Sequence, residues 1–113
     1  MDCLFCKIIN GEIPSSKVYE DEMVYAFRDI DPQAPQHIIL IPKVHITSAN
    51  EITPENSKYV ARIFEVVPAL AKKLGIAEGG YRLVNNCGAD GGQTVPHLHF
   101  HLMGGRSFGW PAG

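Results

Sequence analysis

Apolar residues recur with helical spacing in two stretches of the chain. The first stretch is short and covers residues 3–10, where positions 4, 5, 8 and 9 are apolar. Gly11 and then Pro14 follow it, and both residues are typical of a helix end. This pattern predicts a short N-terminal helix.

The second helical stretch is much longer. Thr53 and Pro54 place a hydroxyl at the N-cap position and a proline at the first helical position. Apolar side chains then follow a three-four spacing as far as Leu74, and Gly75 provides a stop signal. Pro68 lies inside this pattern and is expected to kink the helix, because it removes one backbone hydrogen bond.

Shorter stretches show the alternation or continuous apolarity of strands. Residues 18–27 read as two strands joined by an acidic turn, and residues 37–41 are apolar throughout, as expected of a central strand covered on both faces. Residues 81–85 and 95–103 complete the set. The order of elements predicts an α+β fold: a mainly antiparallel five-stranded sheet, one long helix packed against it and the short N-terminal helix.

Length and charge limit the possibilities. The 113 residues fit a single domain covering residues 1–113. The formal net charge of −2, with no basic run, lacks the positive footprint of a protein that binds a nucleic-acid backbone. The N-terminus is unlike a signal peptide and no apolar run could span a bilayer, so we expect a cytoplasmic protein.

Three histidines alternate with apolar residues in the segment 97–103. Side chains at alternate positions of a strand share one face about 7 Å apart, so His97, His99 and His101 are predicted to lie together. Three protonated rings would repel at that distance, which favours the neutral form of at least one ring at pH 7. A neutral imidazole can serve as a nucleophile or as a metal ligand. Spacing alone leaves both a three-histidine metal centre and a structural role open.

A glycine-rich loop, residues 88–94, directly precedes the histidines. It lacks the Gly-Lys-Ser/Thr ending of a P-loop. Its glycines would still allow backbone amides to approach an anion, and Gln93 and Thr94 add side-chain donors. A simple turn between two strands explains the same composition nearly as well.

The cysteines suggest a metal in place of disulfides. Cys3 and Cys6 have the two-residue gap of half a tetrahedral zinc site. The same spacing fits a redox pair, but no strand precedes it as a thioredoxin-like unit requires. Cys87 is a third thiol to which the sequence assigns no role.

Taken together, these segments resemble the histidine triad (HIT) superfamily, and within it the Hint branch of purine nucleoside phosphoramidases of bacterial type. The resemblance extends over essentially the whole chain. It is carried by residues 5–14, 27–37, 41–46 and 90–95, by the alternating histidines, and by residues 104–106 with Trp110-Pro111.

The resemblance implies a two-step transfer of a nucleotide. His99 would attack the α-phosphorus of a purine nucleoside phosphoramidate, and water would then release the nucleoside monophosphate from the covalent nucleotidyl-His99. The departing amine needs a proton, which requires a general acid nearby. The remaining roles implied are phosphate or leaving-group contacts from His101, Asn86, Gln93 and Thr94, and orientation of the histidines by His37.

The resemblance also places the nucleoside. The ribose hydroxyls would bind the Asp29 carboxylate, which can accept two hydrogen bonds. The base would lie among apolar residues that ordinary core packing could also explain: Leu4, Phe5, Ile8, Phe27, Ile30 and Ile39.

Two further features follow from the same resemblance. Relatives with the cysteine pair complete a structural zinc site with two histidines, which correspond here to His45 and His97. A homodimer is implied as well, with the sheet continued across it and the tail around Trp110 reaching the other subunit. No cofactor is expected in the catalytic step itself.

Other functions remain open at this stage. A dinucleoside polyphosphate hydrolase or a nucleotidyl transferase from another HIT branch would use the same nucleophile. A non-enzymatic, zinc-stapled nucleotide-binding scaffold would keep the binding residues and show no turnover. Replacing His99 distinguishes the scaffold from the enzymes.

Overall fold

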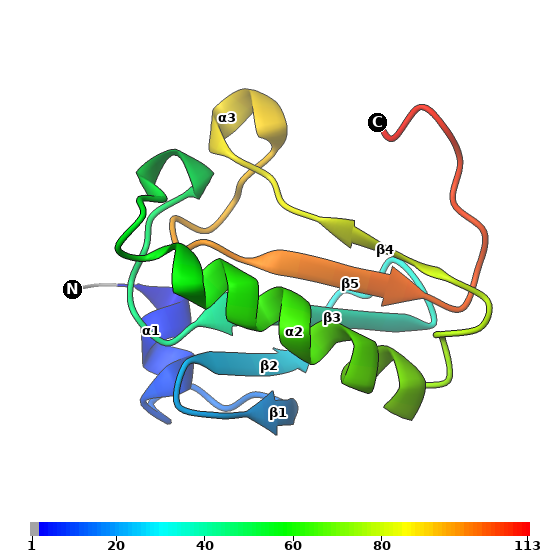
Figure 1. Ribbon diagram of the computed structural model, residues 1–113, viewed down its shortest axis with the longest axis horizontal. Helices are drawn as coiled ribbons and strands as arrows, with labels where there is room; N and C mark the ends of the chain where they lie inside the picture. Colours follow the sequence, from blue (N-terminus) through cyan, green and yellow to red (C-terminus); the bar gives the residue numbers. More distant parts are fainter. Residues whose placement is uncertain (1–2) are drawn as a thin grey trace.

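The computed structural model describes residues 3–113 and is built on one antiparallel sheet (Figure 1). Its strands are β1 (Lys17–Glu20), β2 (Val24–Arg28), β3 (Gln36–Pro42), β4 (Tyr81–Val84) and β5 (Phe100–Gly104). They are arranged in the order β1-β2-β3-β5-β4, with every neighbouring pair antiparallel. The helices are α1 (Leu4–Ile9), α2 (Ser57–Lys73) and the single turn α3 (Gly88–Gly91), with a 3-10 turn at Ala49–Glu51. The predicted α+β fold is therefore confirmed.

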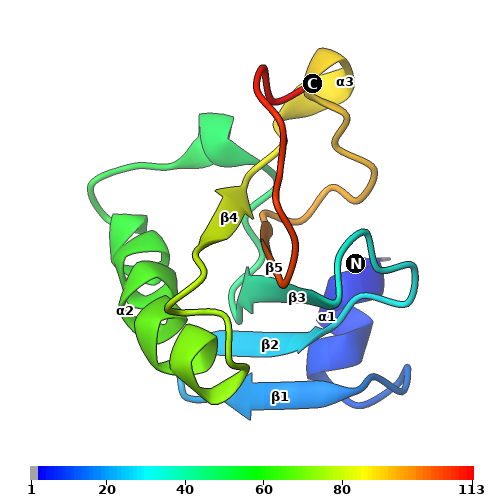
Figure 2. The same cartoon turned by 90° about the vertical axis from the view of Figure 1, so that its right-hand side faces the viewer.

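Helices α1 and α2 cover opposite faces of the sheet (Figure 2). Side chains of β3 alternate between the two faces: Ile38 and Leu40 join the core under α2, whereas Ile39 and Ile41 join the core beside α1. All four are at most 7% exposed. The expectation of a central strand buried on both sides is confirmed, and β3 separates two apolar clusters.

The long helix begins later than predicted. Thr53 and Asn56 close a turn of their own, because the Asn56 side-chain oxygen accepts the Thr53 amide at 2.7 Å and the Thr53 hydroxyl accepts the Asn56 amide at 3.3 Å. The prediction of a start at Thr53-Pro54 is therefore wrong, and α2 starts at Ser57. The helix continues through Pro68, and Gly75 follows its end with a φ of +76°, as the stop signal predicted.

The strand predicted over residues 95–103 is also shorter at its start. Sheet pairing begins at Phe100, and the preceding segment is held by a hydrogen bond from the Leu98 amide to the Ile46 carbonyl at 2.6 Å. Of the three alternating histidines only His101 therefore lies within β5. His97 and His99 occupy the irregular segment that leads into it, on the side of the sheet that α1 covers.

None of the helices within residues 3–113 combines the length and the apolarity needed to cross a bilayer.

Candidate functional site

A cavity of about 360 Å³ lies beside α1 and the histidines. Its walls are formed by Leu4, Phe5, Ile8, Ile13, Pro14, Phe27, Asp29, Ile30, Ile39, Thr94, Val95, His99 and His101. All seven residues predicted to contact a nucleoside are among them. The wall is mostly apolar, and its polar side chains are one carboxylate, one hydroxyl and two imidazoles. A larger hollow of about 670 Å³, between residues 75–82 and 105–108, contains none of the predicted site residues.

His99 is held with one nitrogen facing its own backbone. Its ring is 4% exposed, and Nδ1 lies 2.7 Å from the carbonyl oxygen of His97. A carbonyl only accepts hydrogen bonds, so Nδ1 carries a proton, and in the neutral tautomer Nε2 has the lone pair. Phe5 packs edge-on against this ring with centroids 5.1 Å apart, and the Asn85 side chain donates to the His99 carbonyl at 2.8 Å. The arrangement leaves Nε2 as the unprotonated nitrogen of a tightly held ring.

His37 and His101 form a hydrogen-bonded pair. The backbone amide of Gln33 donates to His37 Nδ1 at 3.0 Å, so the His37 proton is on Nε2. This nitrogen donates to His101 Nδ1 at 2.9 Å. A neutral His101 then carries its own proton on Nε2. The backbone of one loop thereby fixes the tautomers of two rings in succession.

Burial keeps this pair uncharged near neutral pH. Desolvation lowers the pKa of His101 to about 4, with further lowering by the nearby His99 and His37 rings and partial compensation by the Asp29 carboxylate. Desolvation also lowers the pKa of His37, against the opposing effect of Asp29 and Asp31. Both rings therefore enter a reaction at pH 7 as neutral hydrogen-bonding groups.

Asp29, His37 and His101 bring three ligand atoms within 4.8 Å of one another, which raises the question of a metal. The Asp29 carboxylate lies 3.4 Å from His37 Nε2 and 4.0 Å from His101 Nδ1. A metal on His37 Nε2 would move the proton to Nδ1, where it would face the amide hydrogen of Gln33. This group therefore suits a chain of hydrogen bonds better than a cation.

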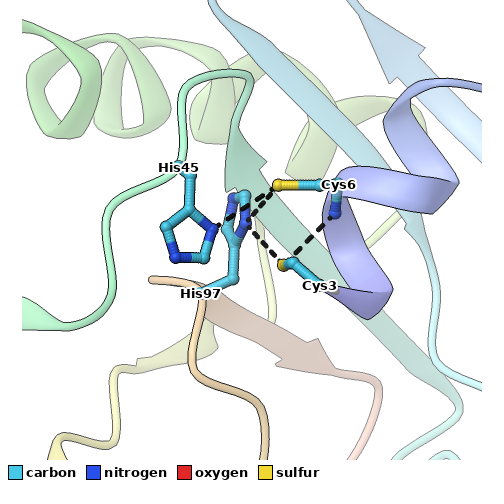
Figure 3. A group of neighbouring side chains, drawn as sticks. All are labelled: Cys3, Cys6, His45 and His97. Atoms are coloured by element: carbon cyan, nitrogen blue, oxygen red, sulfur yellow. Dashed lines mark hydrogen bonds between the residues drawn. The ribbon is translucent and has the colours of Figure 1, made fainter. Parts of the chain in front are cut away.

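A second cluster, formed by Cys3, Cys6, His45 and His97, meets the requirements of a metal site (Figure 3). Cys3 Sγ lies 3.3 Å from His97 Nδ1, and Cys6 Sγ lies 3.5 Å from His45 Nδ1 and 3.6 Å from His97 Nδ1. Zinc bonds of about 2.3 Å to sulfur and 2.0–2.1 Å to nitrogen at tetrahedral angles place S and N about 3.6 Å apart. These three S–N distances are close to those of a tetrahedral zinc site.

The groups around this cluster support the same interpretation. His97 is fully buried and donates from Nε2 to the Pro42 carbonyl at 3.0 Å, so its Nδ1 lone pair faces the two sulfurs. Burial lowers the pKa of His97 to about 4, which keeps it in the neutral, ligating form. Burial and the neighbouring Cys3 raise the pKa of the Cys6 thiol to about 11, so a bound metal would displace its proton.

The three predicted phosphate-binding residues have different surroundings. Thr94 lines the cavity. Gln93 instead stabilises its own loop. Its side-chain nitrogen donates hydrogen bonds to the carbonyls of Thr47 and Val95, and its side-chain oxygen accepts a hydrogen bond from the Gly88 amide. Asn86 is half-buried between β4 and α3 and is not part of the cavity wall.

Sequence reasoning missed several groups at these sites. Ile13, Pro14 and Val95 complete the cavity wall, and the side chain of Asn85 holds the His99 backbone. The Gln33 amide and the Pro42 carbonyl set imidazole tautomers. Backbone groups are present at every residue and leave no signal in the composition. Asn85, in contrast, is a polar side chain next to the predicted Asn86 and could have been identified from the sequence.

Comparison with known proteins gives consistent matches over nearly the whole chain. A model of the HIT domain matches residues 10–108. The purine nucleoside phosphoramidase of Escherichia coli K12 is 48% identical over 108 residues, 96% of this chain and 91% of that protein. The 14 kDa zinc-binding protein of Zea mays is 48% identical over 112 residues, and the match covers 97% of this chain and 87% of that protein. The crystal structure of a HIT family hydrolase from Legionella pneumophila superposes with a TM-score of 0.96 at 50% identity, covering 99% of this chain and all of that one.

Proposed function

The chain belongs to the HIT family, and from that premise we propose that it hydrolyses purine nucleoside phosphoramidates to nucleoside monophosphates through a covalent nucleotide on His99. One observation carries the proposal: a buried imidazole, oriented by a hydrogen bond from Nδ1, lines an apolar cavity whose wall also contains a carboxylate. The similarity to the E. coli phosphoramidase supports the choice of substrate.

His99 supplies the nucleophile. Its Nδ1–H stays on the His97 carbonyl while Nε2 attacks the α-phosphorus, so the positive charge that develops on the ring is stabilised by that carbonyl. The bond to the amine breaks, and imidazole later becomes the leaving group when water attacks the same phosphorus. One difficult displacement is thus divided into two easier ones.

His101 is placed to assist the leaving amine. Its neutral form has Nε2–H available, because Nδ1 already accepts the hydrogen bond from His37. The Nε2–H of neutral His101 donates a hydrogen bond to the departing nitrogen and so assists the breaking of its bond to phosphorus. His37 acts as a positioning residue that fixes the orientation of His101.

The nucleoside is recognised in two parts. The Asp29 carboxylate accepts the ribose hydroxyls, while its Oδ1 is already oriented by the Asp31 amide at 2.8 Å. The base packs among the apolar side chains of α1, β2 and β3, with the fully exposed Ile30 of the loop after β2 at the cavity edge. Thr94 contributes its hydroxyl on the phosphate side, and Asn86 and Gln93 act through the loop backbone around it.

We propose in addition that Cys3, Cys6, His45 and His97 bind a structural zinc ion. Four protein ligands leave no open position for water, so the metal would stabilise the fold and take no part in the reaction. The S–N spacing and the second hydrogen bond of His97 support this assignment. Metal analysis of the purified protein tests it: about one zinc per chain is expected, and less than about a tenth of an equivalent at a pH where thiolates bind would overturn it.

The protein is also proposed to be a homodimer, with its sheet continued through the edge strand β4. On α2, Phe64 is half-exposed and packs against Phe100 of the neighbouring strand β5, with ring centroids 5.6 Å apart. An exposed edge next to an exposed aromatic side chain is a surface that a second subunit would cover. The tail with Trp110, which is 86% exposed, would then reach the other subunit's site. Light scattering of the wild type and Phe64→Glu tests this, because the variant should be monomeric.

The enzymatic proposal is tested by following amine release from an adenosine phosphoramidate that carries a fluorescent amine. Wild-type turnover together with an inactive, folded His99→Gly variant would support it. If the wild type binds AMP and releases no amine, the choice of substrate is wrong. Dinucleoside polyphosphates would be tested next, and absence of turnover there as well would favour a binding scaffold.

A further inference from the structure

Helix α1 serves two sites at once. Its N-cap residue Cys3 and its third residue Cys6 belong to the metal cluster (Figure 3), while Leu4, Phe5 and Ile8 line the nucleoside cavity. The helix has six residues and therefore spans only about 9 Å. Any shift of α1 that changes the metal ligands also moves the wall of the cavity.

Direct contacts join the two sites. The Phe5 ring packs edge-on against His97 of the cluster and against His99 of the cavity, with centroid distances of 5.9 and 5.1 Å. His97 itself offers its side chain to the sulfurs and its carbonyl to His99 Nδ1. A side-chain path and a backbone path therefore both connect the cysteines to the proposed nucleophile.

The short helix depends on these contacts for its position. An isolated helix of this length is unstable in water. At its start the Cys3 sulfur accepts the Cys6 amide at 3.4 Å, in the place where a hydroxyl or carboxylate would cap more strongly. Without a metal, the two cysteines and two histidines are joined there only by sulfur–nitrogen contacts of 3.3–3.6 Å. A metal bound to Cys3 and Cys6 would thus add to the apolar packing of Phe5 and Ile8 in holding α1 in place.

We propose that metal binding at this cluster and nucleotide binding in the cavity are coupled through α1. This rests on the proposed function, since it takes the cluster as a zinc site and the cavity as the nucleotide site. A zinc-loaded cluster fixes α1 and so pre-forms the cavity wall, whereas the zinc-free chain has to order this wall when it binds the nucleotide. Linkage requires the reverse effect as well: bound nucleotide strengthens zinc binding by the same factor.

Calorimetric titration of AMP into the zinc-loaded protein and into the chelator-treated protein measures the coupling. The dissociation constant of AMP should be at least about fivefold higher without zinc. In the complementary titration, saturating AMP should shift the partition of zinc between the protein and a colorimetric chelator by the same factor. A zinc ion that only stabilises the fold would raise the melting temperature and leave the AMP dissociation constant unchanged.

Two variants test whether the coupling runs through the Phe5 side chain. Phe5→Leu keeps the helix and the cysteines but removes the ring between His97 and His99, so the ratio of the two AMP dissociation constants should fall towards one. Cys87→Ser removes the cysteine outside the cluster and should retain the full ratio. A Phe5→Leu ratio equal to that of the wild type would overturn the side-chain path.

A second measurement avoids the zinc-free state, in case circular dichroism shows that chelation unfolds the chain. Protein loaded with cadmium gives a metal NMR resonance that reports the geometry at the thiolates, and AMP should shift this resonance. Equal AMP dissociation constants with and without zinc, or an unshifted resonance in the AMP complex, would contradict the coupling. Failure of AMP to bind either form would instead contradict the proposed function.

Discussion

His97 and His99 are two residues apart, buried and on the same side of the sheet, yet they present opposite nitrogens to their surroundings. His97 donates from Nε2 to the Pro42 carbonyl and offers Nδ1 to two sulfurs. His99 donates from Nδ1 to the His97 carbonyl and keeps Nε2 for the cavity. The carbonyl bound by each ring therefore determines which nitrogen is free, and the elements around that nitrogen determine whether it faces the two cysteines or the cavity.

The largest expected effect comes from removing the nucleophile. His99→Gly should lower amine release from an adenosine phosphoramidate by at least about a thousandfold, because no other group replaces the covalent step. Its zinc content should equal that of the wild type, since His99 is not part of the metal cluster. Stopped-flow fluorescence and metal analysis measure the two properties. Residual turnover within about tenfold of the wild type would exclude His99 as the nucleophile.

Replacing a proposed zinc ligand should, unlike replacing His99, remove the metal. Cys6→Ser is expected to lose its zinc and to lower the melting temperature by roughly 10 °C, which corresponds to about 2 kcal/mol in a domain of this size. Calorimetry with and without a chelator checks this. The matched variant Cys87→Ser should melt like the wild type, and equal melting of all three proteins would show that the cluster does not bind a stabilising metal.

Asp29 allows a test of the cavity alone. Asp29→Asn should raise KM for an adenosine phosphoramidate about tenfold, the cost of a weakened charge-assisted hydrogen bond, and should change kcat much less. A substrate without both ribose hydroxyls should show nearly the same KM with the wild type and the variant. A tenfold loss with that substrate too would mean that Asp29 acts through His37 and not through the ribose.

The smallest expected effect concerns pH. The pKa of His101 is lowered to about 4 by burial, whereas the unfolded chain titrates near 6.5. Between these values the unfolded chain binds a proton that the folded protein excludes, so stability is complete above pH 6.5 and is lost as the pH falls towards 4. In His101→Gln the decrease in melting temperature across this window should be a few degrees smaller. Parallel curves for the two proteins would contradict a buried, neutral His101.

The sequence predicted most of the fold because its apolar positions are periodic. The two-sided burial of β3 and the stop at Gly75 both followed directly from the pattern. The errors occurred where a local side chain or a loop contact overrides the pattern: the Thr53–Asn56 turn delays α2, and the bond from Leu98 to Ile46 delays β5.

The features of the candidate site that depend on side-chain identity could be predicted from the sequence. The alternating histidines and the cysteine pair indicated chemistry, and the family resemblance supplied Asp29 and the apolar wall that the structure brings together. The tautomers were beyond sequence reasoning, because the Gln33 amide and two backbone carbonyls set them. The coupling of α1 to both sites likewise depends on distances between segments far apart in the chain.

Stereochemistry at phosphorus distinguishes a covalent nucleotide on His99 from direct attack by water. A phosphoramidothioate of adenosine that is chiral at phosphorus would be hydrolysed by the wild type in isotopically labelled water, and the configuration of the product determined. Attack by His99 Nε2 followed by attack of water gives two inversions, so the account predicts retention of configuration. Inversion would show a single direct displacement by water and would contradict a covalent nucleotide on His99.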